Sequence, residues 1–413
     1  MRVTQTLNQL QFIASLNTLE SNLAQTQNQI SSQLSFTTPS QNPVAAGAVD
    51  GYNQSLAQAT QYDTNANSAQ TALGTEDNAM SQVQTALQSL RDLALQANSG
   101  ALTAPDRSSI ATQAKQIQAT LVALANTQDG NGEYIFGGYT TQTQPFSLSA
   151  TGATYAGDLG QRQVPISAGQ SVAIGDSGAA VFNQIPNGNG TFTAAAASGN
   201  TGTGVLGATT VSNAAAYDGK PYSIVFATAT SASGVVTTTY NIFDSTGAKV
   251  TPGVVPPSPG AAYTSGQAIS YDGGQVTLTG QPANGDTFNV APSTNQSVFT
   301  TVQNLVTSLQ AGGSSSSSNA QLNNSIAGFL NNVDQALNQV SNVRSGIGGR
   351  LNSITTQLSV SSSQQIQLKT SIASLQGLDY ASALTKLTLQ QTALTASMQA
   401  YTLTQGLSLF KYM

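Results

Sequence analysis

The residues of this chain that could do chemistry are carboxylates and one glycine-rich stretch, because the sequence contains no histidine and no cysteine. That composition excludes disulfides, thiolate chemistry, imidazole metal sites and every catalytic triad that needs histidine. Five aspartates in the middle of the chain are candidates for a carboxylate pair or a calcium site. Each lies beside or close to glycine or serine, so we interpret them as turn residues: Asp158, Asp176, Asp244, Asp272 and Asp286.

The glycine-rich stretch from Gly202 to Gly207 matches the dinucleotide-binding pattern letter for letter. It neither follows a convincing strand nor opens a periodic helix, so we expect a surface loop without a nucleotide. A carboxylate-based glycan hydrolase would need an acid and a nucleophile, and residues 145–292 offer no convincing pair. The sequence therefore predicts a protein that is not an enzyme, with no catalytic, cofactor-binding or metal-ligating residues.

The charge of the chain is low and slightly acidic. Charged residues make up 7% of its 413 residues and the net charge is -5, which argues against a nucleic-acid partner. No stretch of about 18 apolar residues is present, and the first residues have no apolar core with a cleavage site. We therefore expect no membrane partner, and either a cytoplasmic location or export by a route without a cleavable signal peptide.

The two ends of the chain carry the elements around which the rest is organised. The segment from Asp379 to Met413 has a heptad seam at steps of three and four, and the segment from Met1 to Leu34 has two apolar runs among polar residues. Such seams must be buried, so we expect the two termini to lie side by side; the plain alternative is a helical hairpin within a monomer. The seam residues are Leu384, Leu387, Gln391, Leu394, Met398, Tyr401 and Gln405 at one end, and Val3, Leu7, Leu10, Phe12, Leu16, Leu19, Leu23 and Ile30 at the other.

Helical periodicity also dominates the regions next to the two ends. Pro39 and Pro43 break the first helix, and a heptad then runs through Leu73, Met80, Val83, Leu87, Leu90, Ala94 and Ala97. Thr103 to Asp106 caps a further helix. From Ile326 to Leu375 a nearly unbroken seam predicts a long rod, in which Gly346, Gly348 and Gly349 mark a bend or a close helix approach.

The middle of the chain changes to a period of two, which is typical of β-strands. Tyr222, Ile224 and Phe226 alternate before a turn at Ser233-Gly234, and Asp272-Gly273-Gly274 is a hairpin signal. We also predict a short strand from Tyr134 to Tyr139, and surface loops over 188–207 and 252–259.

These patterns predict an α+β fold in which both termini form a long antiparallel helical bundle or coiled-coil stalk with an inserted β-rich domain. The predicted division has five segments: 1–42, an N-terminal assembly helix; 43–144, the N-terminal half of the stalk; 145–295, the β-rich outer domain; 296–376, the C-terminal half of the stalk; and 377–413, a C-terminal assembly helix.

Several motifs of this sequence resemble the flagellar hook-associated protein 3 family, the flagellin-related protein of the hook-filament junction. The resemblance covers both helical arms well and the middle weakly. It rests on Pro39-Ser40-Gln41-Asn42-Pro43-Val44-Ala45-Ala46, Asn126 to Tyr139 with Pro145-Phe146, Gly285 to Val290, Asp379-Tyr380-Ala381, Gln390 to Ser397 and Leu407 to Phe410. The chain departs from the family pattern at Gln33-Leu34-Ser35, where a Thr-Gly-basic stretch is usual. It departs again at Gln41 and Asn42, where acidic residues are usual, which leaves their polar contacts open.

The resemblance implies a secreted structural subunit of the extracellular bacterial flagellum. It would leave the cell unfolded through the flagellar export channel, with an export chaperone and the export apparatus as partners. It would then assemble as a homo-oligomeric ring between hook-associated protein 1 and the flagellin filament. Flagellin itself, or an exported adhesin, are the alternatives. We expect the assembly interface at Leu7, Leu10, Leu16, Leu19, Leu23, Ile30, Leu384, Leu387, Leu394, Met398, Tyr401, Leu407 and Leu409.

Overall fold

The computed structural model describes residues 2–99, 102–250 and 260–410, with side chains from residue 6 to residue 403. The chain divides into two compact units. The first comprises Met1–Asn65 with Thr356–Met413, and the second comprises Ala66–Thr355. Two long helices, α2 (Pro43–Ala97) and α5 (Ser316–Gln376), contribute residues to both units. Each unit is described here by itself.

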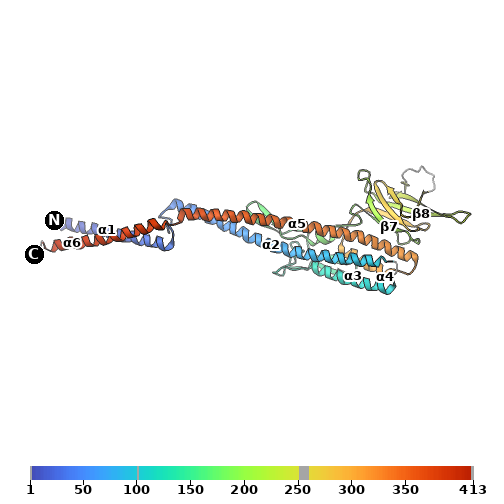
Figure 1. The fold of residues 1–413 in the computed structure, drawn as a ribbon, viewed down its shortest axis with the longest axis horizontal. Helices are drawn as coiled ribbons and strands as arrows, with labels where there is room; N and C mark the ends of the chain where they lie inside the picture. Colours follow the sequence, from blue (N-terminus) through green and yellow to red (C-terminus); the bar gives the residue numbers. More distant parts are fainter. Residues whose placement is uncertain (1, 100–101, 251–259, 411–413) are drawn as a thin grey trace. The chain divides into compact units, whose positions relative to one another are not determined.

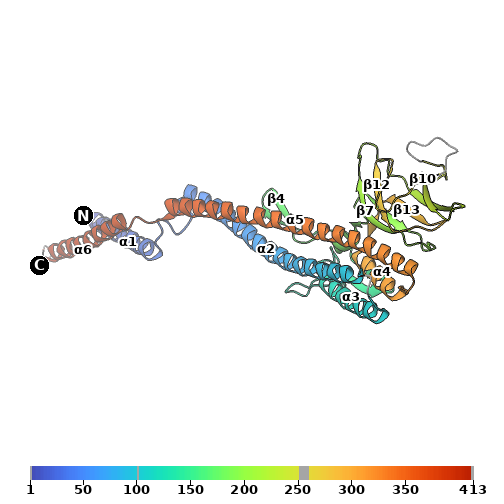
Figure 2. The same cartoon turned by 45° about the vertical axis from the view of Figure 1, so that its right-hand side comes forward.

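The first unit is built from helices of both chain ends. α1 (Arg2–Ser32) and α6 (Tyr380–Phe410) pack side by side and antiparallel (Figures 1 and 2). The start of α2 and the end of α5 enclose a small core in which Phe36 is buried against Ala45, Ala46 and Val49, with Ile372 packed on it. The expectation that the two termini lie side by side is therefore confirmed.

The helices of the second unit pack around the heptad of α2. All seven predicted heptad residues from Leu73 to Ala97 are buried, because a repeat near 3.6 residues keeps one face of the helix toward its neighbours. α3 (Ala104–Ala125) starts at a capping box, in which Thr103 and Asp106 bond reciprocally. α3 packs on α4 (Val298–Ala311), and both lie beside α2 and α5 in the two views.

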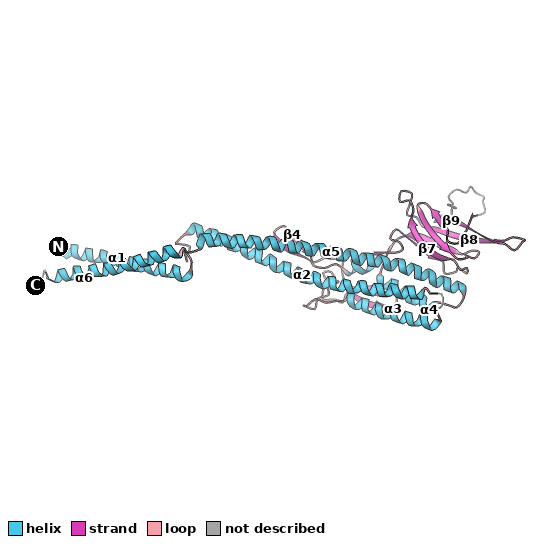
Figure 3. Ribbon diagram, viewed as in Figure 1, coloured by secondary structure: helices cyan, strands magenta, loops and turns pink. Residues whose placement is uncertain are grey.

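The strands of the second unit are confined to one stretch of the chain, between α3 and α4 (Figure 3). The larger sheet has five strands in the order β10 (Ala261–Ala262), β9 (Val236–Asp244), β8 (Tyr222–Thr230), β13 (Thr287–Pro292) and β6 (Phe192–Ala196). A three-stranded sheet has the order β11 (Ala268–Tyr271), β12 (Gly274–Thr279) and β7 (Val205–Val211). Three short antiparallel pairs are β1 (Phe146–Ser149) with β2 (Gly152–Tyr155), β3 (Gln163–Ser167) with β4 (Gln170–Ala173), and β5 (Ile185–Pro186) with β14 (Asn295–Gln296).

The two larger sheets share one hydrophobic core. Tyr222, Ile224 and Phe226 of β8 are all buried in it, as their period of two predicts. The predicted hairpin at Asp272 and Gly273 joins β11 to β12. Both residues have positive φ, as a two-residue hairpin turn requires. The α+β fold, with paired terminal helices and a central β-rich region, is confirmed.

Three local predictions differ from the structure. Tyr134 to Tyr139 forms turns rather than a strand, since its backbone groups bond singly to several separate segments, at Thr127, Thr141, Asp158 and Gly178, and not to one partner strand. The predicted loop 188–207 contains β6 and the first three residues of β7, while 252–259 lies outside the described residues. α5 is one helix from Ser316 to Gln376, and a Cβ added at Gly348 or Gly349 would meet nothing within 4 Å, so no close helix approach occurs there.

Among the aspartates predicted as turn residues, Asp286 binds the backbone of two separate loops of the β-rich region. Asp286 is 3% exposed and accepts N–H groups from Thr201 (2.8 Å), Gly202 (3.0 Å) and Ala283 (2.8 Å). The first half of the glycine-rich stretch, up to Gly204, is thereby a loop bound to a carboxylate, which disfavours an anionic phosphate beside it, whereas Val205 to Gly207 are the first residues of β7 rather than the predicted loop. In the described ranges no helix is long and apolar enough to span a lipid bilayer.

Replacing Asp286 with alanine is expected to destabilise the second unit. The change removes the acceptor of three backbone donors, and each buried unpaired donor costs about 1–3 kcal/mol. Urea unfolding followed by circular dichroism should show a lower midpoint for Asp286→Ala. Asp244→Ala is the matched control, because Asp244 also accepts backbone N–H groups but in an exposed turn. Equal midpoints for the two variants would contradict the assignment.

Candidate assembly surface

The side of α1 that faces α6 is a continuous heptad stripe. Its apolar members are half-buried, and Thr26 fills the step between Leu23 and Ile30, where it is 1% exposed and donates to the Asn22 carbonyl at 3.0 Å. The regular steps of three and four keep these side chains on one face of the helix. The stripe consists of Phe12, Leu16, Leu19, Leu23, Thr26 and Ile30.

The predicted seam of α6 divides into two stripes in the structure. Leu387, Leu394 and Tyr401, seven residues apart, are half-buried toward α1. Leu384 and Met398, which share the other heptad position, are exposed. A single antiparallel partner therefore covers only half of the two-stripe seam.

The contact between α1 and α6 is fixed most specifically at Tyr401. Its ring stacks on Phe12 with centroids 5.1 Å apart and an interplanar angle of 12°. Its hydroxyl accepts a hydrogen bond from the Gln9 amide at 3.2 Å. Aromatic stacking contributes about 0.5–1.5 kcal/mol beyond area burial, so this pair sets the register of the two helices.

The outward sides of both helices also carry large apolar side chains. At about 100° per residue, Leu389 and Leu403 lie on the side of α6 opposite its contact with α1, and they are 67% and 69% exposed. On α1, Leu7 and Leu10 likewise point away from α6 and are exposed. A helix that is apolar on several sides is normally surrounded by other helices. The first unit thus presents apolar surface that its own chain leaves uncovered: Leu7, Leu10, Ile13, Leu384, Leu389, Met398 and Leu403.

The bases of α1 and α6 are tied to each other by backbone hydrogen bonds. Leu34 and Gly377 form an antiparallel bridge, and beside it the Ser35 N–H donates to the Gln376 carbonyl at 2.8 Å. The Leu378 N–H donates to the Gln33 carbonyl at 3.1 Å. Gln33 takes a positive φ of 64° to make this crossing, a conformation uncommon outside glycine. Gln33-Leu34-Ser35, where the sequence departs from the family pattern, is therefore the stretch whose backbone is hydrogen-bonded to residues 376–378.

The two residues that replace the family's acids act as hydrogen-bond acceptors. The Asn42 side-chain oxygen accepts the Ala45 N–H at 3.1 Å and caps α2, and the Gln41 side-chain oxygen accepts the Thr37 N–H at 2.8 Å. An amide oxygen can do this as a carboxylate would. At the start of α6, hydrogen bonds from Ser382 hold the pKa of Asp379 below its usual range, so a negative charge lies at that helix N-terminus.

The family motif from Asn126 to Tyr139 has a structural task in the second unit. Asn126 makes reciprocal 2.8 Å bonds with the backbone of Phe146, and Phe136 is buried edge-on against Phe182. Gly138 has a φ of 71°, and a Cβ there would collide with Asp158. The motif therefore joins α3 to the first strands.

Ligand chemistry has little support in the described residues. They contain no group of three or more Asp or Glu side chains that could hold a metal ion. A 380 Å³ groove between β6, α4 and α5 is lined by amide, hydroxyl and apolar side chains alone. Its lining therefore offers no titratable pair for acid–base catalysis.

The thirteen predicted interface residues fall into three groups. Leu16, Leu19, Leu23, Ile30, Leu387, Leu394 and Tyr401 meet within the pair, whereas Leu7, Leu10, Leu384 and Met398 face outward. Leu407 and Leu409 lie outside the residues whose side chains are described. Sequence reasoning missed Ile13, Leu389 and Leu403 as outward apolar residues. The spacing of fourteen between Leu389 and Leu403 was the available signal, because it equals two heptads.

Leu394→Asp is expected to separate α6 from α1, whereas Leu389→Asp should leave the pair intact. Leu394 lies in the stripe facing α1 and Leu389 on the opposite side, and burying a leucine contributes about 1.5–3 kcal/mol. Hydrogen exchange of the monomer should show faster exchange in α1 and α6 for Leu394→Asp only, by about tenfold or more. Equal exchange in the two variants would contradict the division into stripes.

Comparisons with known proteins match both arms of the chain. Residues 3–141 match the bacterial flagellin N-terminal helical region, and residues 330–413 match the bacterial flagellin C-terminal helical region. Flagellar hook-associated protein 3 of Salmonella typhimurium is 37% identical over 157 residues, which are 38% of this chain and 49% of that protein. The aligned part spans about half the length of the curated relatives that the chain matches.

Two solved structures extend the similarity to most of the chain. FlgL of Xanthomonas campestris is 30% identical with a TM-score of 0.69, over 78% of this chain and 99% of that one. The flagellar junction protein FlgL of Legionella pneumophila is 29% identical with a TM-score of 0.71, over 80% of this chain and 100% of that one. On the identity and coverage of these matches, the chain belongs to the flagellar hook-associated protein 3 (FlgL) family of flagellar structural proteins.

Proposed function

We propose that this chain is the subunit of a junction ring that links hook-associated protein 1 to the flagellin filament. The observation that carries the proposal is the uncovered apolar surface on the outward sides of α1 and α6. A second copy of the chain placed around the same axis would present the same surface, and repeated head-to-tail contacts form a ring when the rotation from copy to copy closes on itself. The Legionella relative is named as a flagellar junction protein, which supports the same location.

The thirteen predicted residues would then act at two levels. The inner stripe, represented by Leu394 and Tyr401, pairs the two ends of one chain. The outward residues among them, represented by Leu384 and Met398, pack together with Leu389 against neighbouring copies, hook-associated protein 1 and flagellin. Burying each exposed leucine there would contribute about 1.5–3 kcal/mol. The five-segment division of the chain is part of the same proposal, with 1–42 and 377–413 as the assembly segments.

The proposed route to this position is export through the flagellar channel, assisted by a chaperone that covers the terminal helices before assembly. Terminal helices with an uncovered apolar side would aggregate if left free. The location would be the extracellular flagellum, and the role purely structural. The low number of charged residues in the chain is consistent with helices that are covered by other helices rather than exposed to solvent.

Leu389→Asp is expected to abolish incorporation into flagella while the monomer keeps its α1–α6 pair. A buried unpaired carboxylate costs several kcal/mol, and this cost arises only when a neighbour covers Leu389. The measurement is the amount of protein in sheared, washed flagella, by quantitative immunoblot. Thr388→Asp is the matched control, because it places the same charge at an adjacent exposed position outside the apolar set. Normal incorporation of Leu389→Asp would remove the outward side of α6 from the interface.

Immunogold microscopy with antibody against residues 145–250 is expected to give a single band at the hook-filament boundary. Label along the whole filament would instead identify a flagellin, and label on the cell surface away from flagella would identify an exported adhesin. Either of these results would contradict the junction role.

A further inference from the structure

The heptad of α2 contains an acid at a core position. Between Leu73 and Met80 the seam steps through Glu76, which is 0% exposed. Acids are almost never fully buried without a partner. One oxygen of Glu76 accepts the Asp176 N–H at 2.9 Å, while Oε2 is buried and has no hydrogen-bond partner among the described residues. The terminal-helix assembly makes no use of this residue.

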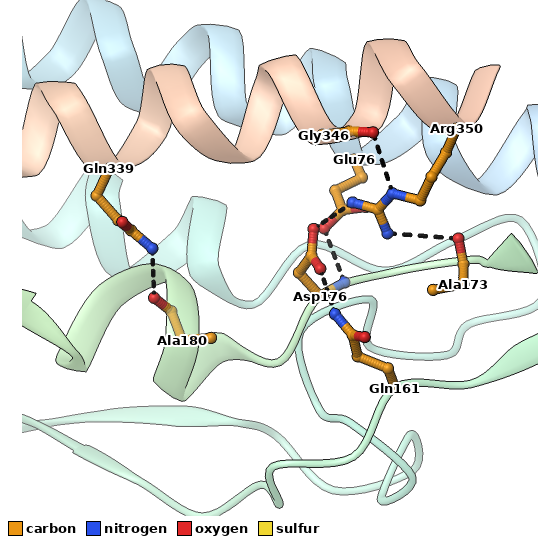
Figure 4. Close-up of polar contacts among 8 residues, drawn as sticks. All are labelled: Glu76, Gln161, Ala173, Asp176, Ala180, Gln339, Gly346 and Arg350. Atoms are coloured by element: carbon orange, nitrogen blue, oxygen red, sulfur yellow. Dashed lines mark hydrogen bonds and ion pairs between the residues drawn. The ribbon is translucent and has the colours of Figure 1, made fainter. Parts of the chain in front are cut away.

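Glu76 lies beside a second carboxyl group and a guanidinium group, which come from two other parts of the chain (Figure 4). Asp176 belongs to the segment between β4 and η1 (Ala179–Asn183), and Arg350 belongs to α5. Arg350 forms an ion pair with Asp176 and donates to the Ala173 carbonyl at 3.3 Å. On α2 itself, the neighbouring Asp77 is paired with Arg344 of α5 at 2.8 Å.

The charges of this cluster balance only when one acid is neutral. Asp176 and Arg350 already neutralise each other, with side chains 14% and 19% exposed. An ionised Glu76 would therefore add an unpaired negative charge on a side chain that is itself fully buried, which is strongly unfavourable. The pKa of Glu76 is raised to about 8, mainly by burial and next by the charge of Asp176, while the Asp176 N–H and Arg350 act in the lowering direction.

We propose that Glu76, Asp176 and Arg350 form a proton-dependent latch, which holds the segment from Ala173 to Ala180 on α2 and α5. The latch is closed when Glu76 carries its proton and weakens when Glu76 loses it. The same segment is also bound farther along α5, where the Gln339 amide donates to the Ala180 carbonyl at 2.9 Å (Figure 4). Opening at Glu76 therefore releases the Asp176 end of the segment while the Ala180 end keeps its neutral contact.

The direction of the pH effect follows from proton linkage. The closed state binds the Glu76 proton more tightly than the open state, whose carboxyl has an ordinary pKa near 4.5. The latch is therefore strongest below pH 4.5. As the pH rises above 4.5, the equilibrium constant for opening increases by about tenfold per pH unit, until the pH reaches about 8. Above that pH Glu76 is deprotonated in both the closed and the open state, so the opening constant no longer depends on pH.

The test is hydrogen exchange of the full chain at the Asp176 amide, with correction for the intrinsic chemical exchange rate. From pH 5.5 to 7.5 the opening constant is expected to rise about a hundredfold in the native protein, which is two units at tenfold each. In Glu76→Gln, which has nearly the same shape but does not ionise, it should stay constant. In Asp77→Asn, the matched control next to it, the native pH dependence should persist.

A carbon-13 titration of the Glu76 carboxyl in the native protein gives a second readout that does not depend on a variant folding. A midpoint well above 4.5 is expected. The proposal is overturned by a midpoint near 4.5, by a flat exchange profile in the native protein, or by a native-like pH dependence in Glu76→Gln.

Discussion

The burial of apolar stripes along very long helices is the constraint on which this structure depends. α2 has 55 residues and α5 has 61, and most of the stability of a helix in a protein comes from packing its apolar face rather than from backbone propensity. In the second unit the stripes are covered by neighbouring helices, so Leu73, Leu87 and Ile347 are almost completely buried. In the first unit α1 and α6 cover only one side of each other. That difference underlies the proposed assembly: one unit buries its apolar stripes within the chain, and the other leaves large apolar side chains exposed.

The β-rich region depends on the helices through an aromatic cluster. Phe299 at the start of α4 packs against Phe146 of β1 and Phe182 of η1, with ring centroids 5.0 and 5.7 Å apart. Next to this cluster the Asn126 side chain bonds to the backbone of Phe146 in both directions at 2.8 Å. In a chain with so few charged residues, Glu76 stands out as a fully buried acid whose Oε2 has no hydrogen-bond partner among the described residues.

Much of the fold and part of the assembly surface could be predicted from the sequence, where local patterns suffice. The α2 heptad and the Asp272-Gly273 hairpin were predicted correctly, because helix periodicity and positive φ are properties of a few adjacent residues. β6 was missed, because its Ala- and Thr-rich stretch has no alternation and its partner is far along the chain: Ala196 pairs with Phe288. Tyr134 to Tyr139 was predicted as a strand from its composition, but a ladder needs a partner strand, and only isolated bonds were available to it.

The sequence by itself determined that both ends are amphipathic helices, that the middle is β-rich, and that chemistry based on histidine or cysteine is excluded. It also contained the motifs that identify the family. Only the tertiary structure decided which half of each terminal seam faces inward, because one antiparallel partner can cover one stripe and periodicity does not say which. It likewise decided the environment of Glu76, because the heptad places that acid in the core but the opposing Asp176 and Arg350 come from elements roughly a hundred or more residues away. Contacts between distant segments depend on packing geometry, which local sequence patterns do not encode.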